Sequence, residues 1–405
     1  MDIFLLAALT CLVIATVGYA VNKVLRLPWM FTVVVFGLTL ATLGWFQTTM
    51  AGRDFQFLAR LGMLFFLFTL GMDLELTQIR KLGKYIVGGN ILLTLTEGFV
   101  LALFFYFGFP KFVNHSFIIA LVAGIAFGTV GEVVLLAILK EFGLEHTRFG
   151  QLALGIGVFD DIFEILVLAV VIALPALVAG GPAAAAWQES TRIVLVLVGL
   201  MLATLLLIWF SPTAQRVLSK VPGDSFVLPF TIFAVIFAFI YFGTRYFENM
   251  GVVAAIFGGI TVRQLLPPKA IEHYRKPIFF VGNIFLGPFF FLSLGGRMSF
   301  SALLTYPWLV LAIMAIALCT RMGISYVLFR NLIGKRESVA LGVGLTSKFS
   351  TSIISENLLF TAGLIGQPLY STMMAAFILL KPIVAGVFSR EVGRIKETGT
   401  PAPLE

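Results

Sequence analysis

The sequence predicts an all-α polytopic membrane protein with about thirteen transmembrane helices. Of its 405 residues, 60% are hydrophobic and only 12% are charged, and the mean hydropathy is +1.03. Soluble domains carry about 25% charged and about 45–50% apolar residues. The 42 phenylalanines also argue against a disordered chain. The apolar residues gather into runs of roughly the ~20 residues that a bilayer-spanning helix needs, which favours one membrane domain.

Thirteen apolar runs are separated by short polar or Gly- and Pro-containing turns. Each run is long enough to cross the hydrocarbon core, or nearly so, as a helix. The first run follows only Asp2 and lacks the basic start of a cleaved signal peptide, so we expect it to be retained. We expect an outside linker at 176–190 and a short tail at 390–405. The runs are 3–23, 28–49, 55–73, 84–109, 114–139, 149–175, 191–211, 225–246, 250–266, 277–299, 306–330, 338–361 and 367–389.

Basic residues divide unequally between the two sides of this arrangement. One side holds five: Arg53, Lys111, Arg192, Arg245 and Arg297. The other side holds nineteen: Lys23, Arg26, Arg80, Lys81, Lys84, Lys140, Arg148, Arg216, Lys220, Arg263, Lys269, Arg275, Lys276, Arg330, Lys335, Arg336, Arg390, Arg394 and Lys396. The positive-inside rule then places the N-terminus outside and the C-terminus in the cytoplasm, as expected for a bacterial inner membrane. The net charge of +8 therefore requires no nucleic-acid partner.

Ten further charged residues lie inside the expected spans. A charge at the bilayer centre costs ~2.5–3.5 kcal/mol on insertion scales, so these residues indicate an ion path or internal ion pairs. They are Arg60, Glu97, Glu132, Asp160, Asp161, Glu164, Arg321, Lys348, Glu356 and Lys381.

Two parts of the chain resemble each other. The stretch FFLFTLGMDL (65–74) matches FFFLSLGGRM (289–298), and ALVAGIAFGTVGEVV (120–134) matches ALGVGLTSKFSTSII (340–354). These matches indicate an internal repeat. The aligned positions include Gly71 with Gly295, Glu97 with Arg321, Gly128 with Lys348, and Asp161 with Lys381.

The two copies are expected to cross the membrane in opposite directions. The first copy, with its core at 55–175, covers spans three to six, and the second, at 277–389, covers spans ten to thirteen. A separation of seven spans is odd, so the topology is inverted. Inverted repeats are typical of secondary transporters, whose ion site lies where the repeats meet. The remaining spans, within 1–49 and 191–266, would link the copies and mediate dimerisation.

Both copies contain a stretch of small and polar residues in mid-span, GIAFGTVGE (124–132) and GLTSKFSTS (344–352). We expect two broken helices that cross near the membrane centre, where protein or a water-filled cavity covers the freed backbone groups. Glu132 and Lys348 would then balance the half-helix dipoles. The alternative is that the small residues serve close helix packing alone.

The motif GIGVFDDIFEILVLAVV (155–171) places Asp160 and Asp161 within a long apolar helix. Adjacent side chains project about 100° apart, whereas Asp161 and Glu164 share a face. A partly dry carboxylate can hold a monovalent cation or a proton but not both, and this competition is the minimum requirement for exchange. Alternatively, the aspartates form ion pairs with Arg321 or Lys348 that only join helices.

Other chemistries are disfavoured. Two aspartates on one helix cannot converge like those of an aspartyl protease, and the three histidines lie in loops or at span ends. No glycine-rich nucleotide motif opens a soluble α/β unit. We therefore expect no enzyme, no cofactor, and no metal beyond a transported monovalent cation.

On these motifs the chain resembles the monovalent cation:proton antiporter-2 superfamily, which includes sodium/proton exchangers and Kef-type potassium/proton exchangers. The resemblance spans roughly 3–390. It implies two inverted repeats that move against a dimerisation domain in an elevator-like cycle. The motifs that carry it are EVVLLAILKEFG (132–143), GVFDDIFEILVLAVV (157–171) and FFFLSLGGRMSF (289–300).

The resemblance also implies roles for individual residues. Asp161 would be the cation- and proton-binding carboxylate, Asp160 would pair with Arg321, and Thr129 would supply cation ligands at the crossing. Two departures from the family leave stoichiometry and electrogenicity open. In SKFS (347–350), Lys348 stands where many relatives have arginine, and Ser350 where they have glutamate. Arg321 stands where sodium-selective electrogenic members have lysine, and an arginine would stay charged throughout the cycle. We assign supporting positions to Glu164, Ser350 and Lys381.

The sequence therefore favours a homodimeric transporter that exchanges sodium for protons in the lipid bilayer and contributes to pH homeostasis. Potassium and lithium are the other candidate cations, and Kef-type potassium/proton exchange is the first alternative. A gated cation channel or membrane sensor is the alternative from another class. The inverted repeat and the absence of a filter-like motif favour alternating access.

Overall fold

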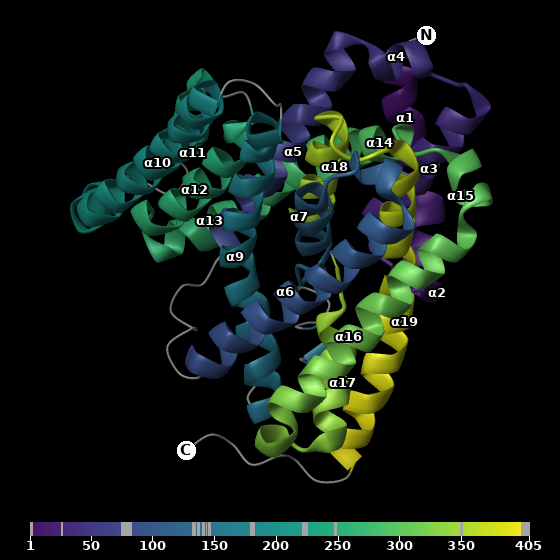
Figure 1. Ribbon diagram of the computed structural model, residues 1–405. Coiled ribbons are helices and arrows are strands. Elements are labelled where there is room, and N and C mark those ends of the chain that lie inside the picture. The colour runs from purple at the N-terminus through teal and green to yellow at the C-terminus, as the bar shows by residue number, and fades with distance from the viewer. Residues whose placement is uncertain are drawn as a thin grey trace. The chain divides into compact units, whose positions relative to one another are not determined.

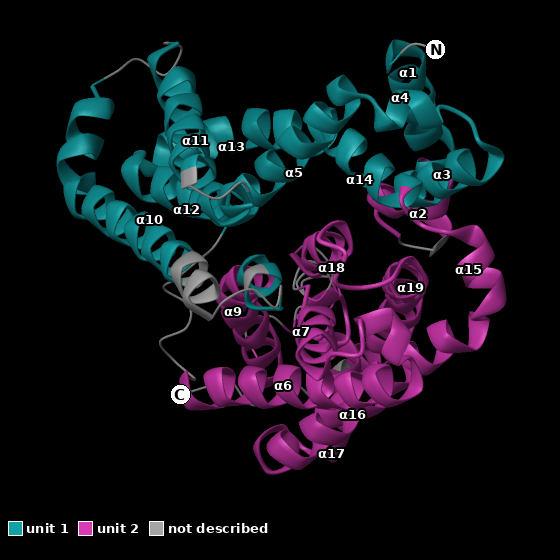
Figure 2. Cartoon of the chain, turned by 45° about the horizontal axis from the view of Figure 1, so that its top comes forward, with its two compact units in different colours: residues 1–18, 32–74, 172–296 teal, residues 19–31, 75–171, 297–405 magenta. Residues whose placement is uncertain are grey.

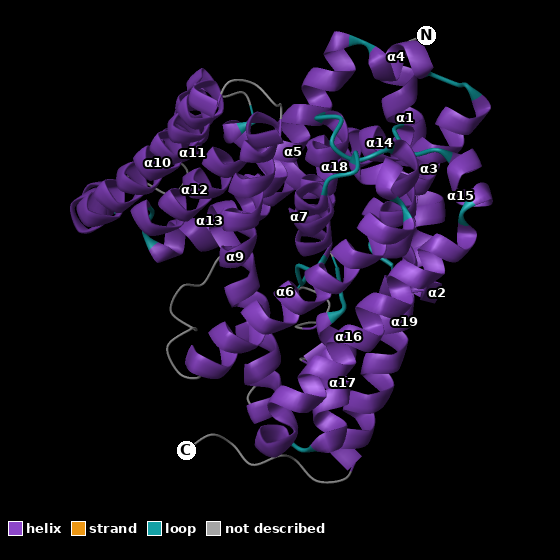
Figure 3. Ribbon diagram, in the orientation of Figure 1, coloured by secondary structure: helices purple, strands orange, loops and turns teal. Residues whose placement is uncertain are grey.

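The computed structural model describes residues 3–25, 27–73, 83–131, 135, 138–139, 142, 144, 147–178, 183–220, 226–246, 249–348 and 351–397. Within these ranges every extended regular element is a helix, and no strand occurs (Figure 3). The all-α class is therefore confirmed.

Eight of the described helices are long and apolar enough to cross a membrane. Three shorter apolar helices, of 10–17 residues, accompany them. Each of the thirteen expected runs is helical over at least part of its length, which agrees with the predicted polytopic architecture. The eight long spans are Ile3–Val24, Arg53–Asp73, Gly83–Gly108, Thr191–Leu218, Val227–Arg245, Pro268–Gly296, Pro307–Ile333 and Gln367–Arg394.

The chain divides into two compact units, each built from segments that are far apart in sequence (Figure 2). Unit 1 comprises Met1–Gly18, Thr32–Leu74 and Ile172–Gly296. Its helices are α1 (Ile3–Val13), η1 (Ile14–Gly18), α3 (Trp29–Leu43), α4 (Gln47–Ala51), α5 (Arg53–Asp73), α10 (Ala183–Leu218), α11 (Val227–Tyr246), α12 (Met250–Leu265), α13 (Pro268–Phe279), η4 (Phe280–Leu286) and α14 (Gly287–Gly296).

Unit 2 comprises Tyr19–Phe31, Glu75–Val171 and Arg297–Glu405. It contains both interrupted helices and the helix with the aspartate pair. Its helices are α2 (Tyr19–Leu25), α6 (Gly83–Gly108), η3 (Pro110–Val113), α7 (Phe117–Phe127), α9 (Arg148–Val178, which extends past the unit boundary), α15 (Phe300–Thr305), α16 (Pro307–Ile333), α17 (Lys335–Leu345), α18 (Thr351–Thr361) and α19 (Gln367–Glu397) (Figure 1).

Glycines allow close helix packing in unit 1. A Cβ atom on Gly71 of α5 would collide with the carbonyl oxygen of Ile256 on α12. A Cβ on Gly295 of α14 would collide with the carbonyl oxygen of Val34 on α3. The internal match aligns Gly71 with Gly295. Both copies therefore use glycine at this position to bring a neighbouring backbone close, as small residues do in membrane bundles.

Several expected boundaries were wrong. Helix α19 continues to Glu397, into the tail expected at 390–405, and α13 begins at Pro268, before the run expected from 277. The linker expected at 176–190 is mostly helical, because α9 continues to Val178 and α10 begins at Ala183. Four consecutive alanines, the best helix formers, follow Pro182 and explain this early start. The run expected at 28–49 is interrupted at Gly44, whose φ of +72° ends α3 and separates it from α4.

The units also divide the chain differently from the expected repeat cores. The first helix of each expected copy, α5 and α14, belongs to unit 1, where the two helices pack together. The last three spans of each copy belong to unit 2, apart from the end of α9. The charged residues of the candidate site are Glu97, Asp160, Asp161, Glu164, Arg321, Lys348 and Lys381, and all of them lie in unit 2.

Candidate functional site

The two interrupted helices meet at their breaks. Helix α7 begins at the N-cap Ser116, whose hydroxyl accepts from the Ile119 N–H, and it ends at Phe127. The peptide N–H of Gly131 donates to the Ser347 carbonyl oxygen at 2.6 Å, and the hydroxyls of Thr129 and Ser352 are hydrogen-bonded. These contacts satisfy backbone groups that the breaks release, as burial in a membrane protein requires. The predicted break in the second copy is present between α17 and α18, and the stretch after the end of α7 lies against it.

Beside these breaks, a single carboxylate accepts hydrogen bonds from two buried basic side chains. Glu97 on α6 accepts hydrogen bonds through Oε2 from Arg321 Nε on α16 and, at 2.9 Å, from Lys348 Nζ. All three side chains are fully buried. Helices α6 and α16 pack side by side, which brings the acid and the guanidinium together (Figure 2). Buried charges are tolerated when they are paired in this way.

Both cations also lie near the C-terminal ends of half-helices. Arg321 Nη2 donates to the Gly128 carbonyl oxygen, immediately after α7 ends. Lys348 follows the end of α17 at Leu345 by three residues. A helix C-terminus carries partial negative charge, which a cation stabilises. The cations therefore compensate both the Glu97 carboxylate and the two interrupted helix ends.

Asp160 on α9 is held by the backbone that follows the end of α7. Its Oδ2 accepts the Val130 N–H at 2.5 Å, and its Oδ1 accepts a long hydrogen bond from the Thr94 hydroxyl at 3.5 Å. Val130 lies three residues after the end of α7, in backbone outside the helix, so Asp160 satisfies a peptide N–H that has no helical partner. Asp160 is fully buried.

The expected Asp160–Arg321 ion pair was wrong, as was its alternative with Lys348. Both cations lie within Coulombic range of Asp160 but are hydrogen-bonded to Glu97. The reason is geometric: Glu97 projects from α6 directly onto Arg321 and Lys348. The Asp160 carboxyl is instead held by backbone at the break.

Asp161 and Glu164 lie on the same helix, α9, three residues apart. Asp161 is 6% exposed, whereas Asp160 is 0% and Glu164 is 1% exposed. Neither Glu164 oxygen has a hydrogen-bond partner among the described residues. Glu164 lies within Coulombic range of Asp160, Asp161 and Lys348. All three acids on this helix are buried, and Asp161 has the largest exposed fraction.

The remaining predicted residues are partly accounted for. The Lys381 ammonium of α19 donates to the Ser347 hydroxyl at 3.0 Å, at the second break. Thr129 donates to the Ala126 carbonyl oxygen at 3.1 Å and contacts Ser352. Glu132 and Ser350 lie outside the described residues. Within unit 2 the structure thus brings Asp160, Thr129, Arg321, Lys348 and Lys381 to the neighbourhood of the crossing.

Sequence reasoning did not assign a role to Glu97, although it identified the residue as an intramembrane charge. A signal was present, because the internal match aligns Glu97 with Arg321. The two residues form an ion pair between corresponding helices of the two copies. Ser352 and the Gly128 carbonyl were also missed, and no pattern in the sequence distinguishes them from other small residues nearby.

The family model for the transmembrane sodium/hydrogen exchanger matches residues 12–392. The chain therefore belongs to the sodium/hydrogen exchanger family of integral membrane proteins. This is a family of secondary transporters, which confirms the resemblance noted from the motifs.

Several characterised proteins are similar over most of their length. A sodium/proton antiporter of Enterococcus hirae is 22% identical and covers 94% of this chain and 97% of its own. The sodium/proton–potassium antiporter GerN of Bacillus cereus is 23% identical, covering 84% and 83%. The potassium/proton antiporter subunit KhtU of Bacillus subtilis is 25% identical, covering 84% and 80%.

A solved structure shares the fold. The sodium proton antiporter MjNhaP1 from Methanocaldococcus jannaschii superposes with a TM-score of 0.59. The match covers 97% of this chain and 94% of that one at 15% identity. The sodium/proton antiporter fold expected from the sequence is therefore confirmed.

Proposed function

We propose that the chain exchanges a monovalent cation, with sodium favoured, for protons, and that Asp161 is the carboxylate for which the two compete. The observation that carries the proposal is the position of Asp161. It lies next to Asp160, whose carboxyl is bonded to the break, and it is the most exposed acid of α9. The antiporter relatives support the same reaction class.

The competition follows from simple electrostatics. A cation beside Asp161 favours the ionised carboxylate, and a dry surrounding favours the protonated form. The described residues contain no group of three or more His, Cys, Asp or Glu side chains that could hold a metal ion. We therefore propose that one carboxylate acts with hydroxyl and backbone oxygens near Thr129 and the break. Oxygen ligands of which only one is charged suit a monovalent cation that must bind weakly enough to be released.

The transport cycle we propose is alternating access of elevator type, in which the last three spans of each copy move against the other spans. The interrupted helices support it, because their ends lie beside Asp160 and the two cations. Homodimerisation, an inner-membrane location and a role in pH homeostasis belong to the same proposal. Sodium is favoured over potassium on the adjacent aspartates, and Kef-type potassium/proton exchange is the second candidate because KhtU is among the relatives.

Proton flux in proteoliposomes tests the proposal. The purified chain should move protons in response to sodium, lithium or potassium gradients, as read by an internal pH-sensitive dye. Asp161→Asn keeps the shape of the side chain but removes the exchangeable charge, so cation-driven flux should vanish. Asp54→Asn, at an exposed site in α5, is the matched control and should retain exchange.

Two outcomes would refute the assignment. The wild-type chain could show no proton flux with any of the three cations, which would refute cation/proton exchange as its function. Alternatively, Asp161→Asn could retain more than about half of the wild-type flux. That result would exclude Asp161 as the exchanging carboxylate, because a neutral amide cannot alternate between proton and cation. Cation current without proton flux would favour the channel alternative.

A further inference from the structure

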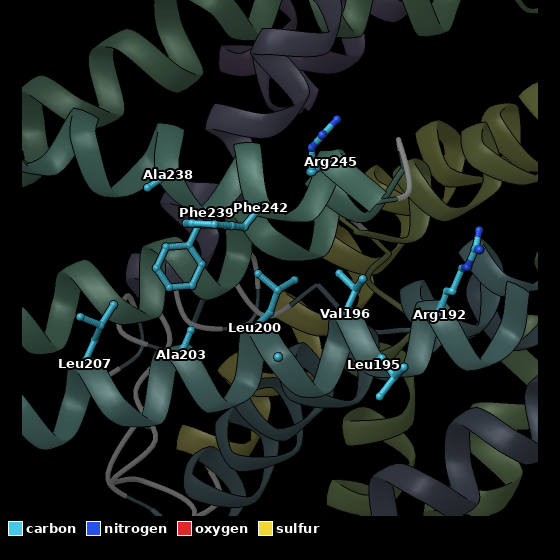
Figure 4. A pocket seen from close by; sticks show the side chains of 11 residues that line it. Arg192, Leu195, Val196, Leu200, Ala203, Leu207, Ala238, Phe239, Phe242 and Arg245 are labelled. Atoms are coloured by element: carbon cyan, nitrogen blue, oxygen red, sulfur yellow. The ribbon is translucent and has the colours of Figure 1, made fainter. Parts of the chain in front are cut away.

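An apolar groove runs along two helices of unit 1. It lies between α10 and α11, has a volume of about 980 Å³, and opens to the surroundings of the protein (Figure 4). Leu200 and Phe239 form its buried floor, and Leu195 and Phe242 are exposed along it. Both helices are membrane spans, so the groove faces the region that lipid occupies.

Two arginines stand at one end of this apolar groove. Arg192 comes from the early part of α10 and Arg245 from the end of α11, and both are exposed (Figure 4). Among the described residues neither guanidinium has an ion pair or a hydrogen bond. The groove thus pairs a long apolar surface with two uncompensated positive charges at a single end.

We propose that this groove binds an anionic phospholipid, with an acyl chain along the apolar walls and the phosphate between Arg192 and Arg245. Guanidinium groups recognise phosphate oxygens through paired hydrogen bonds. Arginines near a helix end reach toward the headgroup region while their stems stay on apolar surface. The apolar walls of the groove therefore match the acyl chain of a phospholipid, and the two arginines match its phosphate.

A second copy of the chain fits the groove less well. A two-fold symmetric contact would enclose both arginines of each copy in one interface, because the same patch contributes from each partner. Among the described residues that line the groove, no acid is present to offset the positive charges of these arginines. A negatively charged headgroup offsets them, which is why we assign the groove to lipid.

Lipid titration of the purified full chain tests the assignment. Phosphatidylglycerol and phosphatidylcholine are added separately in detergent, and bound lipid is counted by native mass spectrometry. The wild type should retain phosphatidylglycerol in preference. Arg192→Gln with Arg245→Gln should weaken that binding about tenfold or more, because two charge-assisted contacts are lost. Arg53→Gln, an exposed arginine of α5, should bind like the wild type.

Each other outcome would overturn the assignment. Equal retention of both lipids would show that the arginines select no headgroup. If inorganic phosphate competes as well as the lipid does, the site holds only a free anion. If the double variant shifts the monomer–dimer ratio at constant lipid, a second copy covers the groove. Both arginines are exposed, so the double variant should fold, and its melting temperature in phosphatidylcholine should confirm this.

Discussion

Glu97 determines how the buried charges of unit 2 are arranged. Its Oε2 atom accepts from both Arg321 and Lys348, one from α16 and one from the second break. Each cation would otherwise be a buried charge, which costs several kcal/mol without a partner. Because Glu97 takes both, Asp160 is bonded to backbone, and neither cation forms an ion pair with it.

Removing one member of this cluster should be costly, whereas removing a complete pair should be less so. Glu97→Gln is expected to destabilise the protein by about 3–5 kcal/mol, since it leaves two buried cations without their acid. Arg321→Gln should cost less, since Glu97 keeps its ion pair with Lys348. The double variant should recover part of the loss. Thermal unfolding in detergent, analysed as a double-mutant cycle, measures this coupling.

The same cycle with Asp160→Asn in place of Glu97→Gln is the control. Asp160 lies within Coulombic range of Arg321 without a hydrogen bond to it, so its coupling should be smaller. Equal coupling for both acids would contradict the contacts described above.

At the scale of elements, the interrupted helices and the close-packed helices serve different purposes. The breaks after Phe127 and Leu345 expose backbone groups in unit 2, where they bond to each other and to charged side chains. In unit 1, glycines such as Gly71 remove side chains so that uninterrupted helices can touch. Both devices depend on small residues, which is why composition alone does not separate them.

Gly71→Ala tests the packing role. The added methyl group would meet the Ile256 carbonyl oxygen, and backbone cannot shift as cheaply as a flexible side chain. We expect a loss of about 1–3 kcal/mol or more from this overpacking. Gly88→Ala is the control, because nothing lies within 4 Å of a Cβ at that position of α6. It should be neutral or stabilising by up to about 1 kcal/mol, since alanine favours helix. Similar melting temperatures for the two variants would contradict the close approach.

At the scale of the whole molecule, each unit joins segments that the chain places far apart. Unit 2 contains both interrupted helices, and unit 1 contains the glycine-packed helices and the lipid-facing groove. The orientation of the chain in the membrane is a prediction from the distribution of basic residues. It is independent of the proposed ion chemistry and can be tested separately.

Cysteine labelling tests the orientation. Single cysteines at Arg216 and Arg336 should react with a membrane-impermeant maleimide only from the cytoplasmic side, and those at Lys111 and Arg245 only from outside. All four positions are exposed, so access depends on sidedness. We expect this sidedness because lysine and arginine are concentrated in the loops assigned to the cytoplasm.

The labelling needs a clean background. The native Cys11 and Cys319 are exposed, so both are replaced by serine first, and the doubly substituted chain serves as the unlabelled control. If two or more of the four sites react from the wrong side, the thirteen-span arrangement fails.

The sequence by itself determined the spans, the two breaks and the acidic helix. These features are local, because hydropathy over one helix and the small-residue content of a short stretch do not depend on neighbours. The internal match also aligned Gly71 with Gly295, and both proved to be sites of close backbone approach. Local composition failed at helix ends, among them 176–190 and Gly44, where alanine propensity and a single backbone angle moved the ends.

Only the tertiary structure decided which charges pair. Glu97 and Asp160 are both buried acids near Arg321, and no spacing in the sequence tells which one faces it. The choice depends on the rotation and axial position of α6 and α9 relative to α16, which helix packing sets. If one of these helices shifted by a few ångströms, an acid in an ion pair with Arg321 would keep only a weaker electrostatic interaction with it. The membrane spans therefore follow from local composition, whereas the partner of a buried charge is determined only when the helices pack together.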